Sequence, residues 1–158
     1  MALETAGVRA CLGGGWSVDA LLGEQTRVHS DLDLWVPAND LHQLLQVMVQ
    51  HGVDRVFPWP GDQPWNWVLH DGVSRKVDLH LYEPVSDTEW HYGSALGGQT
   101  FPAEALAGRG SIGDLVVRCE SAEWALRFHS GYEPQDTDRR DMRLLCERLG
   151  MELPPGLR

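Results

Sequence analysis

Polar and apolar residues alternate along three segments in the first half of the chain, and this alternation predicts β-strands. The segments cover residues 29–36, 65–70 and 76–82. Side chains two residues apart share one face of a strand, so each segment has a polar and an apolar face. Asp71-Gly72 lies between the second and third segments and is typical of a hairpin turn. The pattern therefore predicts a half-buried sheet.

Apolar residues at helical spacing predict four helices, two beside these strands and two in the tail of the chain. The first follows a glycine triplet, which we interpret as a tight turn that opens a helix. Each helix has a plausible cap or a glycine stop in the sequence. We expect helices over 16–22, 40–51, 122–129 and 137–149, with caps at Asn39, Ser121 and either Asp136 or Thr137, and stops at Gly23, Gly52 and Gly150.

Proline and glycine mark the segments between these elements. Residues 56–64 carry three prolines and residues 93–113 are rich in glycine, so we expect the first to be loop and the second to be irregular. Strands and helices thus share the chain to about residue 95, and a smaller helical part follows. The sequence predicts an α+β fold with one domain over 1–95 and a mostly helical subdomain over 96–158.

The chain is acidic, which narrows the classes of partner. Its 158 residues contain 13 Lys and Arg against 23 Asp and Glu, a net charge of −10. Proteins that grip nucleic-acid backbone use clustered Lys and Arg, so we expect no nucleic-acid partner. No apolar run approaches the roughly 20 residues that span a bilayer, so we expect no membrane partner.

The cysteines and the amino terminus predict a cytoplasmic protein. The three cysteines are Cys11, Cys119 and Cys146, an odd number without a CxxC pair. This fits neither a disulfide framework nor a zinc site, so we expect reduced, mostly buried thiols. The first residues lack the basic start and the apolar stretch of a signal peptide.

Three aspartates could converge on a metal ion. Asp31 and Asp33 project from the same face of the first predicted strand, and Asp78 lies on the polar face of a later one. If the strands are neighbours, three carboxylates meet, as magnesium requires of its protein ligands. Taken alone, an Asp-x-Asp pair is more often a solvated strand face. A glycine turn that opens a helix also offers backbone N–H groups to a phosphate, and this combination favours a metal and phosphate site.

These residues also carry a resemblance to a known family. The run from Gly14 to Gly23, with Thr26-Arg27 and then residues 29–34, resembles the signature of small antibiotic nucleotidyltransferases. The similarity is to the lincosamide nucleotidyltransferases and the aminoglycoside 2''-adenylyltransferases of the DNA polymerase beta-like superfamily. It continues through Lys76-Val77-Asp78 and, more loosely, through 117–121. The resemblance implies a nucleotidyltransferase mixed sheet flanked by helices, with a small helical part on the substrate side.

The resemblance further implies a reaction and roles for residues. AMP would pass from ATP to a hydroxyl of an aminated, sugar-containing small molecule. A lincosamide is the first choice of acceptor and an aminoglycoside the second. The cofactor would be magnesium, bound as two ions. A homodimer is possible. The family pattern assigns Asp31, Asp33 and Asp78 to the metal, Asp78 also to the general base, and Gly14 and Gly15 to the triphosphate.

Other assignments remain open at this stage. Ser17 could reach a phosphate. Arg27 and Lys76 could neutralise the triphosphate or form surface ion pairs with Asp19 or Asp71, and His29 could contact phosphate or be structural. His80 is an alternative base, because its ordinary pKa lies near working pH. Four tryptophans could stack on a sugar or a nucleobase, or could simply pack in the core: Trp59, Trp65, Trp67 and Trp90. An acidic cluster could bind an amine of the acceptor, or could be a solvated loop: Glu83, Asp87 and Glu89.

A different class of function is a catalytically idle nucleotide-binding or partner-binding module, similar to an antitoxin of the same superfamily. The intact set of three aspartates argues against it, since the loss of a metal ligand is the simplest mark of an idle copy. The sequence therefore favours an enzyme.

Overall fold

The computed structural model describes residues 2–58, 66–94 and 96–158, and it divides the chain into two compact units. Unit 1 contains the residues up to Cys11 and residues 30–103. Unit 2 contains residues 12–29 and 104–158. Each unit is therefore built from two separate stretches of sequence.

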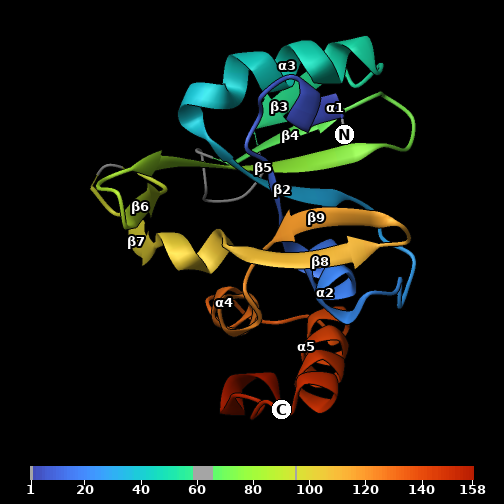
Figure 1. The fold of residues 1–158 in the computed structure, drawn as a ribbon, viewed down its shortest axis with the longest axis vertical. Helices are drawn as coiled ribbons and strands as arrows, with labels where there is room; N and C mark the ends of the chain where they lie inside the picture. The colour runs from blue at the N-terminus through green and yellow to red at the C-terminus, as the bar shows by residue number, and fades with distance from the viewer. Residues whose placement is uncertain (1, 59–65, 95) are drawn as a thin grey trace. The chain divides into compact units, whose positions relative to one another are not determined.

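Unit 1 is a mixed sheet with helices on one face (Figure 1). Its strands are β2 (Leu32–Pro37), β3 (Arg55–Pro58), β4 (Asn66–His70) and β5 (Lys76–Pro84), in the spatial order β3-β4-β5-β2. β2 runs parallel to β5, while β4 is antiparallel to both β3 and β5. β6 (Glu89–Tyr92) pairs with the end of β5, and β7 (Gln99–Pro102) pairs with β6.

The helices of unit 1 are α1 (Ala2–Thr5), a 3-10 turn η1 (Ala38–Asp40) and α3 (Leu41–Gln50). The face of α3 that contributes to the core carries Leu44, Val47 and Met48, which are buried. These positions follow the helical spacing expected for a helix with one apolar face.

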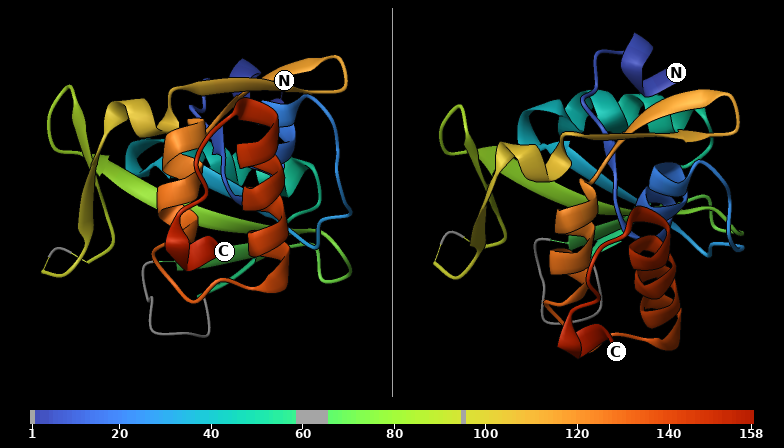
Figure 2. Two further views of the ribbon diagram at one scale, coloured as in Figure 1. Left: turned by 90° about the horizontal axis from the view of Figure 1, so that it is seen from below. Right: turned by 60° about the horizontal axis from the view of Figure 1, so that its bottom comes forward.

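Unit 2 combines a small sheet with three packed helices (Figure 2). Leu12, from the short strand β1 (Cys11–Leu12), pairs with β9 (Leu115–Cys119), which forms a hairpin with β8 (Gly108–Ile112). The helices are α2 (Gly14–Leu22), α4 (Ala122–His129) and α5 (Asp136–Leu149). The 3-10 turns η2 (Ala103–Leu106) and η3 (Pro155–Leu157) complete the order of elements. A shared apolar core joins the three helices: Val18, Ala125, Leu126, Met142, Leu145, Cys146 and Leu157.

The close packing of α2 on β8 depends on glycine. A Cβ atom at Gly110 would lie 2.0 Å from the carbonyl oxygen of Ala20, which is backbone and cannot move aside cheaply. α2 ends at Gly23, whose φ of 75° is left-handed and suits a residue without a side chain. The same glycine content that makes this part of the sequence look irregular therefore allows a helix to lie directly against a strand.

The predicted α+β class, the strand that carries Asp33, the β4–β5 hairpin and all four helices are confirmed. Several local predictions are wrong. Arg55–Pro58 is a strand where we expected loop, and the segment expected to be irregular contains β7, η2 and β8. Asn39 lies in η1 and does not cap α3, and Gln135 caps α5 through a capping box with Asp138. The strands β6 and β9 were not predicted.

The two units differ from the division drawn at residue 95. Residues 12–29, which carry the glycine turn, belong with the C-terminal residues in unit 2, and the later boundary lies at 103/104. The assignment of 1–95 to catalysis and 96–158 to the substrate stays a prediction about function. Among the described residues, no helix is both long and apolar enough to cross a bilayer.

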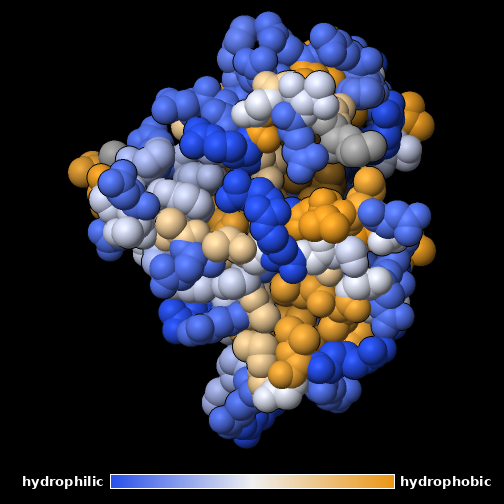
Figure 3. All heavy atoms as spheres, viewed as in Figure 1, coloured by the Kyte–Doolittle hydropathy of each residue, from blue (hydrophilic) through white to orange (hydrophobic). Residues whose placement is uncertain are grey.

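Unit 2 also exposes large apolar side chains. Val28, Leu115, Val116 and Leu149 are between 45% and 88% exposed. Apolar side chains gather at the surface over this unit in Figure 3. A homodimer stays a prediction.

Candidate active site

The pairing of β2 with β5 places two of the predicted carboxylates side by side. The strands are parallel, and their register makes Asp33 the direct partner of Asp78. Because in-register residues of neighbouring strands project from the same face, the two carboxylates share one face of the unit 1 sheet. Asp31 lies one residue before β2 begins. The structure therefore gathers all three aspartates at one end of the β2–β5 pair.

Asp78 is a buried carboxyl among like charges. Only 8% of the surface of Asp78 is exposed. Burial, followed by the charges of Asp33 and Asp31, raises the pKa of Asp78 from 3.8 to about 6, while His80 and Lys76 act in the opposite direction. A carboxyl with a pKa shifted by desolvation and by specific neighbours is typical of a functional site.

His80 connects Asp33 to the interior of unit 1. Its Nε2 lies 3.2 Å from Oδ1 of Asp33, and its Nδ1 lies 3.1 Å from the hydroxyl of Tyr92. Both ring nitrogens are therefore engaged by side chains of the same unit.

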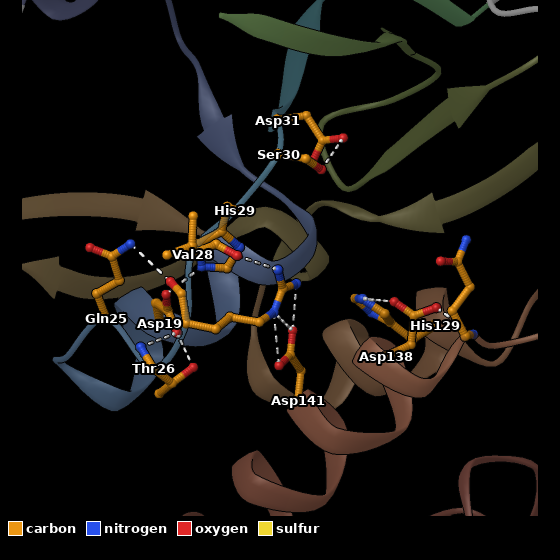
Figure 4. A network of polar contacts seen from close by, with 12 residues as sticks. Asp19, Gln25, Thr26, Val28, His29, Ser30, Asp31, His129, Asp138 and Asp141 are labelled. Carbon is orange, nitrogen blue, oxygen red and sulfur yellow. Dashed lines mark hydrogen bonds and ion pairs between the residues drawn. The ribbon is translucent and has the colours of Figure 1, made fainter. Parts of the chain in front are cut away.

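Asp31 points to a different partner. Ser30 donates a hydrogen bond from its Oγ to Oδ2 of Asp31 at 3.0 Å (Figure 4). In the part of the chain that the structure describes, no three His, Cys, Asp or Glu side chains stand ready to enclose a metal ion.

Lys76 is exposed at the start of β5, two residues before Asp78. The two side chains share a strand face, and the lysine charge opposes the rise in the pKa of Asp78. The structure thus places one of the two predicted cations beside the carboxylates.

The predicted glycine turn lies in unit 2. Gly13 is the N-cap of α2, and Gly14 adopts a φ of 54°, in the left-handed region that favours glycine. A Cβ atom at Gly15 would come within 2.3 Å of Nη2 of Arg27 and 2.7 Å of the His29 ring. The two glycines therefore let the chain turn tightly while the side chains of Arg27 and His29 lie close to its backbone.

Asp19 holds the loop that follows α2, a role that sequence reasoning missed. Its carboxylate accepts hydrogen bonds from the backbone N–H of Thr26 at 3.0 Å and from the Thr26 hydroxyl at 2.6 Å (Figure 4). Nε2 of His29 lies 2.5 Å from the second oxygen, and the His29 ring packs on Trp16. The available signal in the sequence was an aspartate flanked by Val18 and Ala20 in an apolar helix, and the structure buries it fully. The structural reading of His29 agrees with these contacts.

Arg27 is paired with an acidic residue of α5. Its Nη2 lies 2.7 Å from Oδ2 of Asp141, and its Nε donates to both carboxylate oxygens. Burial opposes the guanidinium charge, but the hydrogen bonds and charge of Asp141 leave the pKa of Arg27 raised. The ion-pair alternative for Arg27 named Asp19 or Asp71 as partners, and the observed partner is Asp141.

Ser17 is engaged in packing. The residue is fully buried, and its Oγ accepts a hydrogen bond from the backbone N–H of Glu120 at 3.1 Å. This bond joins α2 to the residue after β9. Because the residue is fully buried, a phosphate could reach this hydroxyl only if the surrounding packing opened.

The remaining candidates are divided by the structure. Trp90 stacks on Tyr82 and contributes to an aromatic cluster, while Trp67 is 37% exposed. The acidic cluster Glu83, Asp87 and Glu89 is exposed. Trp59 and Trp65 lie outside the described residues.

The cysteines are free and buried, as expected. Burial raises the pKa of the Cys119 thiol to about 11 and also raises that of Cys146. Both are therefore unreactive thiols at neutral pH.

Comparison with known proteins identifies relatives of this chain in sequence and in fold. A lincosamide resistance protein of Staphylococcus haemolyticus is 28% identical over 134 residues, which cover 85% of this chain and 81% of that protein. Among solved structures, the lincosamide antibiotic adenylyltransferase LnuA with lincomycin bound is similar with a TM-score of 0.75. It is 26% identical, and the match covers 90% of this chain and 89% of that one.

A second solved structure is ANT(2'')-Ia in complex with adenylyl-2''-tobramycin, with a TM-score of 0.69 and 25% identity over 94% of this chain and 84% of that one. The family model described as aminoglycoside-2''-adenylyltransferase matches residues 1–145. These findings confirm the resemblance inferred from the sequence. With nine-tenths of its length matched by that model, the chain belongs to the aminoglycoside-2''-adenylyltransferase family and is a nucleotidyltransferase.

Proposed function

We propose that the protein transfers AMP from ATP to a hydroxyl of an aminated, sugar-containing antibiotic, with magnesium as the cofactor. The single observation that carries the proposal is the pairing of Asp33 with the buried Asp78 on adjacent parallel strands. The names of the relatives supply the acceptor classes. A lincosamide is our first choice, because LnuA and the staphylococcal protein are similar over most of their lengths. An aminoglycoside is the second, from the family name.

The residues present fit a divalent cation. Two carboxylates on one strand face are hard oxygen donors of the kind that magnesium prefers. The raised pKa of Asp78 also means that its charge is poorly compensated in the free protein, and a cation would compensate it. Asp33 and Asp78 would hold the metal, with Asp31 as the third carboxylate of the set. Bound magnesium would neutralise triphosphate charge and stabilise the leaving pyrophosphate.

Asp78 is suited to accept the proton of the acceptor hydroxyl. In the free protein its pKa is about 6, and a bound cation would lower that value, so the carboxylate would be ionised at neutral pH and able to accept a proton. The hydroxyl oxygen would bond to the α-phosphorus, the bond from phosphorus to the pyrophosphate oxygen would break, and the proton would pass to Asp78. His80 is less suited, because its two nitrogens are occupied by Asp33 and Tyr92.

The other predicted contacts divide into two groups. We assign Gly14 and Gly15 to triphosphate contact through backbone N–H groups, and Lys76 to charge neutralisation. Arg27 is satisfied by Asp141, so we assign it first to ordering the loop after α2. Ser17 is omitted from the set because its hydroxyl is buried and bonded. The cytoplasm, where ATP and magnesium are available, remains the expected compartment.

The test is an acceptor screen that follows pyrophosphate release. Purified protein, ATP and magnesium are combined with lincomycin, clindamycin, tobramycin or kanamycin. Mass spectrometry then shows whether the mass of the acceptor has increased by that of one AMP group. We expect release with at least one lincosamide, and none after EDTA or in Asp33→Asn. Asp54→Asn removes an exposed carboxylate of the same unit that has no assigned role, and it should remain active.

Two outcomes would redirect the proposal. Normal turnover of Asp33→Asn with magnesium would refute the metal assignment. ATP binding without pyrophosphate release across the whole panel would favour the idle nucleotide-binding module.

A further inference from the structure

A hydrogen-bonded chain leads from the carboxylate pair into the aromatic core of unit 1. It runs from the Tyr92 hydroxyl to Nδ1 of His80 over 3.1 Å, and from Nε2 of His80 to Oδ1 of Asp33 over 3.2 Å. Neither Tyr92 nor His80 takes part in the transfer step proposed above. The proposed reaction therefore does not explain these two hydrogen bonds.

The chemistry of the three groups determines which group donates and which accepts in each hydrogen bond. An ionised Asp33 can only accept, so Nε2 of His80 must carry the proton of that hydrogen bond. In a neutral ring Nδ1 is then an acceptor, and the Tyr92 hydroxyl is the donor that satisfies it. The phenol thus selects the tautomer that presents N–H to Asp33.

The surrounding rings restrict movement of His80. The Trp35 ring lies 4.8 Å from the His80 ring, and Tyr92 contacts Trp35 edge-on at 5.0 Å. Phe101 packs on the same Trp35 at 5.4 Å. Tyr92 itself is only 7% exposed. A ring held on these sides has little freedom to turn away from the carboxylate.

Strand register explains why these residues meet. Trp35 is the partner of His80 in the β2–β5 pair, and Tyr92 is the partner of Tyr82 in the β5–β6 pair. His80 and Tyr82 are two residues apart on β5, so all these side chains project from the face that carries Asp78. β6, which sequence reasoning did not predict, supplies the hydroxyl.

We propose that His80 and Tyr92 are positioning residues that fix Asp33 for cation binding: the imidazole N–H holds Oδ1 and leaves Oδ2 for the divalent ion. The inference rests on the proposed function, in which Asp33 is a metal ligand. It differs from a general-base role for His80, because the ring keeps its proton on Nε2 and acts only through Asp33. Groups that orient a metal ligand commonly affect metal affinity by 10- to 100-fold.

The first test does not involve a metal. Nitrogen-15 NMR of the histidine rings at about pH 8 distinguishes the two neutral tautomers. We expect His80 to carry its proton on Nε2, and we expect Tyr92→Phe to shift the Nδ1 resonance. A ring protonated on Nδ1 would overturn the proposal, because Nε2 could then not donate to Asp33.

The second test measures binding of Mn²⁺ alone, as a paramagnetic probe for the divalent site, by electron paramagnetic resonance. We expect His80→Ala to weaken Mn²⁺ binding by about 10- to 100-fold. His80→Gln keeps an N–H donor of similar reach and should recover most of that loss. Tyr92→Phe keeps the packed ring and should lie between the two. Tyr82→Phe, which removes a hydroxyl from the same aromatic cluster, is the matched control and should bind as the wild type does.

The outcomes separate this inference from the function on which it rests. If the wild type binds Mn²⁺, Asp33→Asn does not, and His80→Ala binds as tightly as the wild type, the positioning role is wrong and the metal assignment stands. If the wild type shows no saturable binding, both are wrong. Urea denaturation of each variant identifies any loss that comes from unfolding.

Discussion

Asp78→Asn should stabilise the protein at neutral pH, although it should abolish activity. In the unfolded chain this carboxyl has its ordinary pKa of 3.8, while burial and the charges of Asp33 and Asp31 raise it to about 6 in the folded state. Between these two values the folded state binds more protons, so the free energy of unfolding falls as pH rises. Below about pH 3 the acid is neutral in both states and imposes no penalty.

The size of the effect follows from the two pKa values. Because each tenfold change in proton affinity is worth about 1.4 kcal/mol, the full penalty above pH 6 is about 3 kcal/mol. The Asp78 side chain is buried, so solvent screening reduces this figure little, although salt weakens the contribution of the neighbouring charges. Asparagine has nearly the same shape as the protonated acid and stays neutral at every pH.

The assay is urea denaturation followed by tryptophan fluorescence, from pH 4 to 8, with EDTA present. We expect the free energy of unfolding of Asp78→Asn to exceed that of the wild type by about 2 to 3 kcal/mol at pH 7.5 and by only about 0.5 kcal/mol at pH 4. Asp87→Asn controls for the loss of one negative charge in the same unit. A difference between Asp78→Asn and the wild type that does not change with pH would refute the reasoning. Magnesium should narrow the gap at pH 7.5, because the cation stabilises only the wild-type carboxylate.

Three further predictions concern stability and use the same denaturation assay. Arg27→Met should lower the free energy of unfolding by about 3 kcal/mol, because it leaves the buried charge of Asp141 without its partner; an unchanged midpoint would contradict a structural role for this ion pair. Ser17→Ala should cost about 1 kcal/mol, since the buried N–H of Glu120 loses one of its two acceptors and keeps the carbonyl oxygen of Leu12, and a neutral result would return Ser17 to the candidates for phosphate contact. Asn66→Val should raise the free energy of unfolding by about 1 kcal/mol. Oδ1 of Asn66 is buried without a hydrogen-bond partner among the described residues, and valine favours strands. A loss of stability would mean that this oxygen is satisfied.

Local sequence determined those elements that have a strong periodic or capping signal. The helical spacing in α3 and α5, the glycine at the end of α2 and the turn at Asp71-Gly72 each depend on neighbours in the sequence. The strand that carries Asp33 and the strand that carries Asp78 were also predicted from their own alternation. These signals were available because such elements satisfy their local requirements within a few residues.

The glycine-rich segment shows why β8 was missed. Gly108 and Gly110 in β8 are required by backbone that approaches from α2 and from the end of β9, and this requirement is invisible along the sequence. A glycine in a strand usually weakens it, so composition indicated irregular structure. Tertiary packing overrode that tendency.

For the candidate site, the sequence by itself determined the candidate residues and the resemblance they support: three aspartates with strand spacing and a glycine turn. Only the tertiary structure decided how they are related. The parallel register of β2 and β5 made Asp33 and Asp78 neighbours, burial raised the pKa of Asp78, and β6 brought the Tyr92 hydroxyl to His80. Partners such as Asp141 for Arg27 come from residues 114 positions away. A carboxylate's charge state and a histidine's tautomer depend on what surrounds them in space, and that environment is created only when distant segments pack together.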